Sequence, residues 1–308
     1  MPPENDRGRD PSEAALRTAL RVLAGYLALT SVPLVHLAVA GGEWAPLAMH
    51  ALAIGVVVAA LASRGSATRS LRDWTPLGLG PFLYIELRWI IEGAGRPHAD
   101  ALVASWEAGL FPSDPSASLA TRWPSLAVSE LLHVCYLSYY AIVYVPPALL
   151  WLRGRRREFA DTVLALVVVY ALCFATYALF PVDGPRFVHG PSSAPLGPIR
   201  AMVVQLLASG SSRGTAFPSS HVAAALVAAI CALRFQRDVG VVVAVLTAGL
   251  ALGAVYGGYH YAVDVLAGIG TALMALAVVC AISALRDRPF KGQRSIACIR
   301  RASRSRTR

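Results

Sequence analysis

Long apolar runs, separated by short polar segments rich in Arg, dominate the chain. Seven of these runs approach the length of about 20 residues that a helix needs to cross the hydrocarbon core of a bilayer. They lie at about Leu20–Ala40, Trp44–Ala62, Leu126–Leu152, Thr162–Phe180, Phe217–Leu233, Val239–Tyr256 and Tyr261–Leu285. The pattern predicts an all-α protein, a polytopic bundle of transmembrane helices.

An eighth stretch, Pro76–Ile91, is shorter and carries Glu86 and Arg88, so its hydropathy alone does not decide whether it crosses. Five segments hold most of the 28 Lys and Arg residues and are expected on the cytoplasmic side. They are Arg7–Arg21, Arg64–Arg72, Arg153–Arg157, Arg234–Arg237 and Arg286–Arg308. The second and third can share a side only if two crossings separate them, so Pro76–Ile91 is predicted to cross. This gives about eight spans with both termini inside; a re-entrant or interfacial helix at Pro76–Ile91 is the alternative.

Composition agrees with a membrane protein, since 56% of the residues are hydrophobic, 15% are charged and the mean hydropathy is +0.54. The net charge of +10 sits mainly in the segments that flank spans and in the tail 286–308. We therefore expect contact with anionic membrane lipid and no nucleic acid partner. The five cysteines show neither a disulfide framework nor a zinc motif.

The chain divides into four expected regions. Residues 1–15 form a disordered cytoplasmic N-terminus, 16–125 the first transmembrane helices and an external loop, 126–285 a catalytic transmembrane core, and 286–308 a basic cytoplasmic tail. The first run, which ends in Ala38-Val39-Ala40, is also typical of a cleaved secretory signal, and this alternative stays open. The long external segment Gly93–Ser125 suits either a lid or a plain loop, and Ile199–Leu207 is expected to form a short interfacial helix.

Candidate chemistry begins at Ala216–His221, directly before an apolar run. Pro218 suits a first helical turn because its missing N–H group would be unpaired there. Ser219, Ser220 and His221 then lie where a helix start offers free backbone N–H groups and the positive end of its dipole. This arrangement predicts a binding site for an anion such as phosphate.

A second stretch contains His260 and Asp264, which are four residues apart and share one face of a helix. A carboxylate in that position can hold one imidazole nitrogen and leave the other free to attack a substrate. Ionisable residues at the edge of a span are costly and indicate function. Other histidines are less informative: His50 has no nearby carboxylate in the sequence and is read as a packing residue, whereas His133 follows Glu130 closely enough to pair with it.

These stretches resemble the type 2 phosphatidic acid phosphatase superfamily. Pro218–His221 is similar to its P-S-G-H motif, the span from His260 to Asp264 is similar to the end of S-R-x5-H-x3-D, and Asp183–Arg186 occupies the place of K-x6-R-P. The H-Y-x-x-D element is closest to the branch that contains inositol phosphorylceramide synthases. The chain departs from the motifs at Leu179, Ser220 and Gly253-Ala254, where the family has Lys, Gly and Ser-Arg.

The resemblance implies a phosphohistidine mechanism without metal or other cofactor. His260 would attack phosphorus with Asp264 orienting it, and His221 would protonate the leaving oxygen. Ser219, Ser220 and Arg186 would hold the phosphate oxygens. Because the family arginine is replaced by Ala254, we expect Arg213 to assist Arg186.

The sequence therefore predicts a multi-pass enzyme of the cell membrane that hydrolyses a lipid phosphate ester on the extracytoplasmic side. A phosphotransferase that moves a phospho-head group between lipids is the alternative, since both reactions share every step before the acceptor arrives. A non-enzymatic transporter or lipid-binding protein is the alternative of another class. An internal inverted repeat would favour a transporter, and the sequence shows none.

Overall fold

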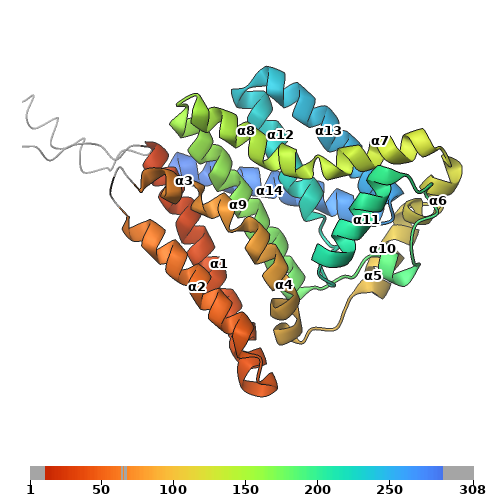
Figure 1. Ribbon diagram of the computed structural model, residues 1–308, viewed down its shortest axis with the longest axis horizontal. Coiled ribbons are helices and arrows are strands. Elements are labelled where there is room, and N and C mark those ends of the chain that lie inside the picture. The colour runs from red at the N-terminus through yellow and green to blue at the C-terminus, as the bar shows by residue number, and fades with distance from the viewer. Residues whose placement is uncertain (1–10, 64, 66–67, 287–308) are drawn as a thin grey trace, which may run out of the picture.

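The computed structural model describes residues 11–63, 65 and 68–286, and within them it is all-α, with fourteen helices (Figure 1). The helix α1 begins at Pro11, inside the segment 1–15 that we expected to be disordered. The remainder of that segment, and almost all of the basic tail 286–308, lie outside the described residues. The helices are α1 (Pro11–Gly41), α2 (Trp44–Ala62), α3 (Arg69–Gly78), α4 (Gly80–Ala94), α5 (Asp100–Leu110), α6 (Pro115–Arg122), α7 (Leu126–Leu137), α8 (Tyr139–Leu152), α9 (Arg156–Leu179), α10 (Pro185–Val188), α11 (Pro198–Gly210), α12 (Ser220–Phe235), α13 (Arg237–Tyr256) and α14 (Ala262–Arg286).

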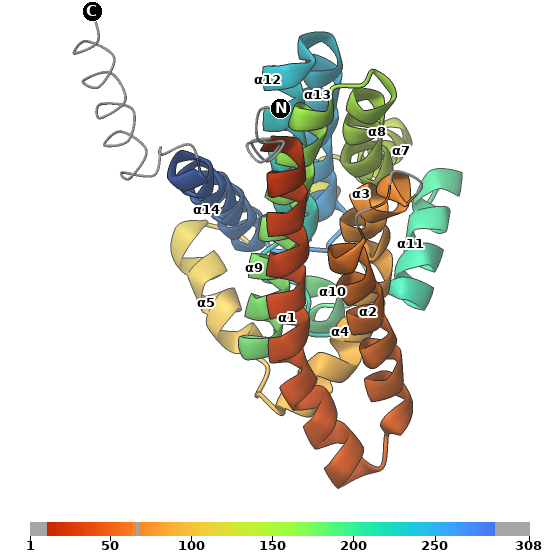
Figure 2. The same cartoon turned by 90° about the vertical axis from the view of Figure 1, so that its left-hand side faces the viewer.

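The helix α9 lies at the centre of the bundle, where it packs against α1, α4, α8, α12 and α14 (Figures 1 and 2). Phe159, Leu164 and Val169 lie on different faces of α9 and are all fully buried. A helix that is apolar on every face needs neighbours on every side, which explains its central position. The helices α1 and α2 form an antiparallel hairpin on one flank, turned at Gly42 (φ 75°).

Within the described part of the chain, five helices are long and apolar enough to cross a membrane, namely α1, α2, α9, α13 and α14. The pair α7 and α8, bent by 42°, makes a sixth span if it is counted as one. The helix α12 has 16 residues, or about 24 Å, which is shorter than the ~30 Å of a hydrocarbon core. The stretch Pro76–Ile91 is divided between α3 and α4. The described residues thus form a membrane-type helical bundle, while eight crossings remain a prediction.

His50 has a carboxylate partner that its sequence neighbourhood does not reveal. Its Nδ1 lies 2.8 Å from Oε1 of Glu86 in α4, and its Nε2 donates to the carbonyl of Leu27 in α1 at 2.8 Å. Both side chains are almost fully buried. The interpretation of His50 as a packing residue without a partner was incomplete, because this pair joins α1, α2 and α4.

Gly249 and Gly253 let α13 approach α7 closely, as the small-xxx-small spacing predicts. A Cβ atom on Gly249 would lie 2.5 Å from Sγ of Cys135, and one on Gly253 would lie 2.5 Å from the carbonyl oxygen of Leu132. Either contact is too short for a real Cβ atom, so larger residues would push the two helices apart. This packing fixes the end of α13, from which the chain continues to His260.

Candidate active site

The first turn of α12 is held by two neighbouring helices. Ser219 occupies the N-cap, where its hydroxyl accepts a hydrogen bond from the N–H of Val222 (3.4 Å) and its own N–H donates to the carbonyl of Asp264 (3.0 Å). The hydroxyl of Tyr177 in α9 donates to the carbonyl of Pro218 (2.8 Å) and accepts from the N–H of Ser220 (3.1 Å). The position of His221, the next residue, is therefore set by contacts with α9 and α14.

His260 follows a sharp chain reversal at the end of α13. Gly258 has a φ of 69°, which favours glycine, and the N–H groups of Tyr259 and His260 both donate to the carbonyl of Ala254 (2.9 and 3.1 Å). The reversal turns His260 toward α12. The ring centroids of His221 and His260 are 6.2 Å apart, so the two predicted catalytic histidines face one site.

The tautomer of His260 is fixed by a backbone carbonyl that the sequence did not indicate. Nδ1 of His260 lies 2.9 Å from the carbonyl oxygen of Ala216, which can only accept, so Nδ1 carries the proton and Nε2 keeps its lone pair. Oδ2 of Asp264 lies farther from Nδ1, at 3.4 Å, and accepts the N–H of Tyr261 at 2.8 Å. Asp264 therefore supports the orientation of His260, together with Ala216.

The site keeps His260 neutral. Burial, reinforced by the positive charge of Arg186, lowers the pKa of His260 to about 4, against a smaller opposing effect of the hydrogen bond to Ala216. An unprotonated Nε2 at neutral pH is the form that can attack phosphorus.

Arg186 and both histidines line one small cavity of about 20 Å³, as Tyr84, Ser211 and Thr215 also do. The Arg186 guanidinium stacks on the ring of Phe187, 4.5 Å from its centroid, and donates to the hydroxyl of Ser211. Arg186 lies in α10, a single turn that begins at Pro185, directly after Gly184 (φ 90°). The structure therefore brings Arg186, His221 and His260 together around one small cavity.

The other predicted phosphate ligands lie differently. Ser220 lines a larger neighbouring cavity together with His221, whereas the fully buried Ser219 uses its hydroxyl as the cap of α12 and lines neither cavity. Arg213 also lines neither: its side chain is 67% exposed and forms an ion pair with Asp183, with Nε 2.9 Å from Oδ2. The structure thus does not bring Arg213 to the two histidines.

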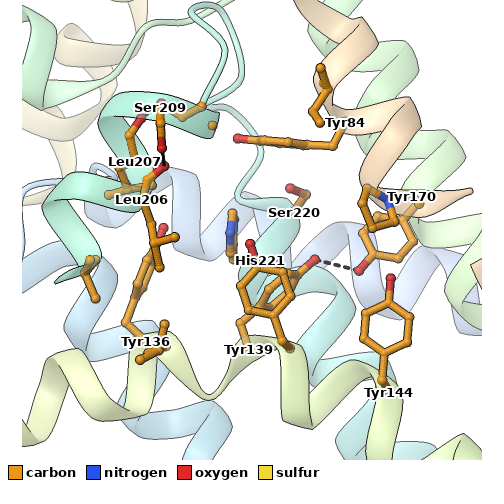
Figure 3. A pocket seen from close by; sticks show the side chains of 18 of the residues that line it. Tyr84, Tyr136, Tyr139, Tyr144, Tyr170, Leu206, Leu207, Ser209, Ser220 and His221 are labelled. Carbon is orange, nitrogen blue, oxygen red and sulfur yellow. Dashed lines mark hydrogen bonds between the residues drawn. The ribbon is translucent and has the colours of Figure 1, made fainter. Parts of the chain in front are cut away.

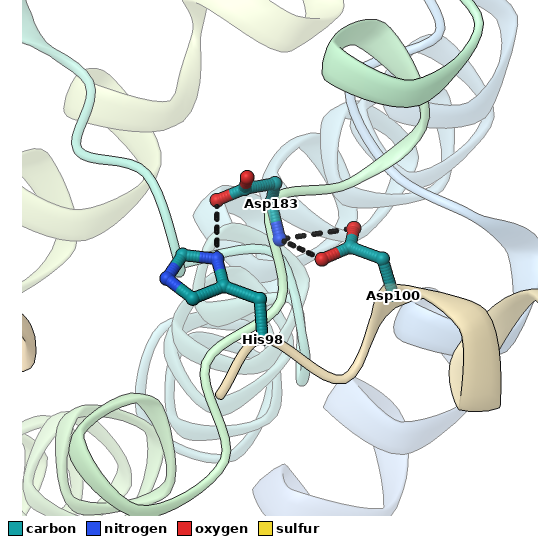
Figure 4. Close-up of side chains that lie close together, drawn as sticks. All are labelled: His98, Asp100 and Asp183. Atoms are coloured by element: carbon teal, nitrogen blue, oxygen red, sulfur yellow. Dashed lines mark hydrogen bonds and ion pairs between the residues drawn. The ribbon is translucent and has the colours of Figure 1, made fainter. Parts of the chain in front are cut away.

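Asp183, Asp100 and His98 form a cluster whose donor atoms lie close enough together to reach one metal ion (Figure 4). Each carboxylate oxygen already accepts a hydrogen bond, however. Both oxygens of Asp100 accept the N–H of Asp183 (3.1 Å), while Oδ1 of Asp183 accepts the N–H of Gly214 (2.8 Å) and its Oδ2 accepts the Arg213 guanidinium. The hydrogen bonds of the cluster therefore hold Asp183, which precedes Arg186, against Arg213 and Gly214, which precede Ala216.

Glu107 is a buried carboxylate that the sequence analysis did not select. From α5 it accepts the N–H groups of Ala262 (2.9 Å) and Val263 (2.8 Å), at the start of α14. Its pKa is raised by burial. No periodicity connects Glu107 to α14, and its burial became known only from the structure, so no signal in the sequence could have found it.

The pair between His133 and Glu130 that their spacing allows does not form. Nε2 of His133 lies 2.9 Å from the hydroxyl of Tyr259, and its Nδ1 lies 2.6 Å from the carbonyl of Ser129. Glu130 instead accepts the N–H groups of Ile199 (2.9 Å) and Arg200 (3.0 Å) at the start of α11. The spacing of Glu130 and His133 on α7 was not sufficient to pair them, because the unpaired N–H groups at the start of α11 compete for the Glu130 carboxylate.

Comparison with known proteins agrees with this geometry. The family model of the PAP2 superfamily matches residues 108–278, more than half of the chain, and this range contains Arg186, His221, His260 and Asp264. No curated protein and no solved structure matches the chain. With its long apolar helices, the chain is a membrane protein that belongs to the PAP2 superfamily, whose members are generally phosphatase-type enzymes.

Proposed function

We propose that this protein cleaves a phosphate ester of a membrane lipid through a phosphohistidine intermediate. One observation carries the proposal: the unprotonated Nε2 of His260, the imidazole of His221 and the guanidinium of Arg186 converge on one small cavity. Two imidazoles on either side of a phosphoryl group supply the nucleophile and the acid that a two-step displacement needs.

In the first step, Nε2 of His260 attacks phosphorus while the bond from phosphorus to the leaving oxygen breaks. His221 donates a proton to that oxygen, and Arg186 balances the charge on the equatorial oxygens. In the second step, water or an alcohol attacks the phosphohistidine and returns a proton to His221, which frees His260. The alternative outcome of the second step is transfer of the head group to a second lipid, as in inositol phosphorylceramide synthases. The H-Y-x-x-D element favours this alternative.

We place the reaction on the extracytoplasmic side of the cell membrane. The two basic turns before α9 and before α13 lie side by side at one end of the bundle, where Nη1 of Arg153 donates to Oε1 of Gln236 at 2.9 Å (Figure 2). Basic residues favour the cytoplasmic side, and the catalytic histidines lie at the opposite ends of α12 and α13.

The test is to trap the covalent intermediate. Purified protein incubated briefly with a ³²P-labelled lipid phosphate and then quenched in alkali should retain label that acid removes, as a phosphohistidine does. His260→Ala should abolish the label. His189→Ala is the matched control, because His189 lies in the same group of external segments, is partly exposed and does not line the cavity. Undiminished label in His260→Ala would refute the mechanism.

A further inference from the structure

A second cavity of about 250 Å³ adjoins the catalytic site (Figure 3). It lies beside the 42° bend between α7 and α8, and its other walls come from α4, α9, α11 and the start of α12. Ser220 and His221 form one end of it, and His221 also lines the small cavity that contains His260. The two cavities therefore meet at His221.

The walls of this cavity are aromatic and uncharged. Among its lining residues, all of them within the described part of the chain, there is no Asp, Glu, Lys or Arg. Two of its hydroxyls bond to each other, that of Tyr139 to that of Tyr170 at 2.5 Å, and that of Tyr144 donates to the carbonyl of Leu77. With these hydroxyls occupied, the walls suit an apolar ligand. Its six tyrosines are Tyr84, Tyr136, Tyr139, Tyr140, Tyr144 and Tyr170.

The cavity has an apolar rim on the outside of the bundle. Ile85 of α4, Tyr140 of α8 and Leu206 of α11 all line it, and they are 45%, 57% and 46% exposed. In a protein surrounded by lipid, exposed apolar side chains on three separate helices contact the acyl region rather than water. A molecule can therefore pass between the bilayer and His221 without crossing a polar surface.

The in-line arrangement of the attacking and leaving atoms around phosphorus indicates what the tyrosine-lined cavity holds. In an in-line displacement the attacking and leaving atoms lie on opposite sides of phosphorus. With His260 attacking from one side, the leaving oxygen points toward His221, and hence toward the tyrosine-lined cavity. The acceptor in the second step approaches along the same direction, because it replaces the group that has left.

We propose that the tyrosine-lined cavity holds the departing alcohol in the first step and the accepting alcohol in the second. Its occupant is the hydroxyl end of an apolar membrane alcohol, whose chain leaves between Ile85, Tyr140 and Leu206. In the second step the alcohol oxygen bonds to phosphorus, the bond from phosphorus to Nε2 of His260 breaks, and the alcohol proton passes to His221. This role rests on the function proposed above and predicts transfer to apolar alcohols in competition with water.

A partition experiment measures this directly. The purified full chain is supplied with acetyl phosphate, whose leaving group is small, and with ethanol or 1-hexanol at equal concentration. The ratio of alkyl phosphate to inorganic phosphate is then measured; it does not depend on how much of the protein is active. Leu206→Trp narrows the rim. Val204→Trp is the matched control, because Val204 is 44% exposed on the same helix and does not line the cavity.

We expect the ratio for 1-hexanol to exceed that for ethanol by at least about tenfold, because each additional buried methylene favours binding. Leu206→Trp should lower the 1-hexanol ratio at least about fivefold and leave the ethanol ratio unchanged, and Val204→Trp should change neither. Equal ratios for the two alcohols, or equal effects of the two substitutions, would overturn the assignment. If the unaltered protein turned over neither acetyl phosphate nor the ³²P-labelled lipid phosphate, the proposed function would instead be refuted.

Discussion

The carboxylate of Glu107 accepts the backbone N–H of Val263 at 2.8 Å, which ties the helix α5 to the first turn of α14. The same carboxylate accepts the N–H of Ala262, and Asp264 accepts that of Tyr261. Three successive N–H groups at one helix start are thus held by two carboxylates, an arrangement that the helix dipole favours. Glu107 acts as a positioning residue for the segment that carries His260.

We predict that Glu107→Ala lowers the melting temperature and also lowers kcat by at least about tenfold, because Ala262 and Val263 lose their acceptor and the His260 segment can shift. Glu107→Gln should retain more activity, since its amide oxygen can still accept one N–H group. The matched control is Glu43→Ala, because Glu43 occupies the N-cap of α2 without a side-chain cap hydrogen bond. A loss of stability in Glu107→Ala with unchanged kcat would show that Glu107 is only structural.

The contact between Ala216 and His260 predicts unequal effects within the catalytic group. His260→Ala and His221→Ala should each reduce kcat by at least about a thousandfold, because the proposed nucleophile and the proposed acid are lost. Asp264→Asn should retain at least about ten times the activity of His260→Ala, since the carbonyl of Ala216 still fixes the tautomer. Rates are to be measured on variants whose melting temperature equals that of the unaltered protein, so that loss of folding does not account for loss of activity. Equal loss in Asp264→Asn and His260→Ala would show that Ala216 does not orient the ring.

The sequence predicted helices and site residues better than it predicted the contacts between them. The bounds expected for one apolar run, Trp44–Ala62, are those of α2, and the sequence motifs selected Arg186, His221 and His260, which the structure places around one cavity. Hydrophobic runs and motif spacing report which residues are buried or polar, and both are local properties of the chain.

The connections could not be predicted because they join distant segments or use the backbone. The carbonyl of Ala216 has no residue-type signature, and the partners of Glu107 and of His50 lie 155 and 36 residues away in the sequence. The sequence could not show that Arg213 pairs with Asp183, a carboxylate from another segment, and the expected role of Arg213 beside Arg186 stays a prediction. The apolar run Leu126–Leu152 did not reveal the 42° bend between α7 and α8, which borders the tyrosine-lined cavity.

Arg213→Ala is expected to act through Asp183 rather than through the phosphate. Because the guanidinium is largely exposed and bonds to Asp183, its removal should lower kcat/KM by less than about threefold and leave the affinity for inorganic phosphate unchanged. Asp183→Asn should lower kcat/KM by at least about tenfold, since Asp183 also accepts the N–H of Gly214. The control is Arg122→Ala, whose exposed guanidinium donates to the hydroxyl of Ser113 and lines neither cavity. If Arg213→Ala weakened the affinity for inorganic phosphate, Arg213 would be a phosphate-binding residue and this prediction would be wrong.

The proposed sidedness predicts a pattern of chemical labelling. In a background without the five native cysteines, Ser193→Cys should react with an impermeant thiol reagent in intact cells, and Gly154→Cys should not. Both positions are exposed, so access to the reagent depends on the side of the membrane. Labelling of Gly154→Cys alone would place the site in the cytoplasm. Gly65→Cys tests the division between α3 and α4, because its labelling from outside would show that this pair does not cross.

The pKa of His260 predicts how activity depends on pH. His260 must be neutral to attack, so the acid limb of kcat/KM should lie near pH 4, well below the ordinary histidine value. The positive charge of Arg186 contributes to this low value. Arg186→Gln should therefore raise the pKa of His260 and move the acid limb to higher pH, whereas Arg186→Lys retains the charge and should leave the limb in place.

The two Arg186 substitutions separate charge from geometry. Arg186→Lys should still lower kcat/KM by at least about tenfold, or ~1.4 kcal/mol, because an ammonium group cannot reproduce the planar, bidentate contact of a guanidinium. Profiles are to be recorded from pH 3.5 to 8 with acetyl phosphate, relative to the unaltered protein, so that the ionisation of the substrate cancels. If Arg186→Lys and Arg186→Gln moved the limb equally, Arg186 would influence His260 through packing, and its charge would not set the protonation of the nucleophile.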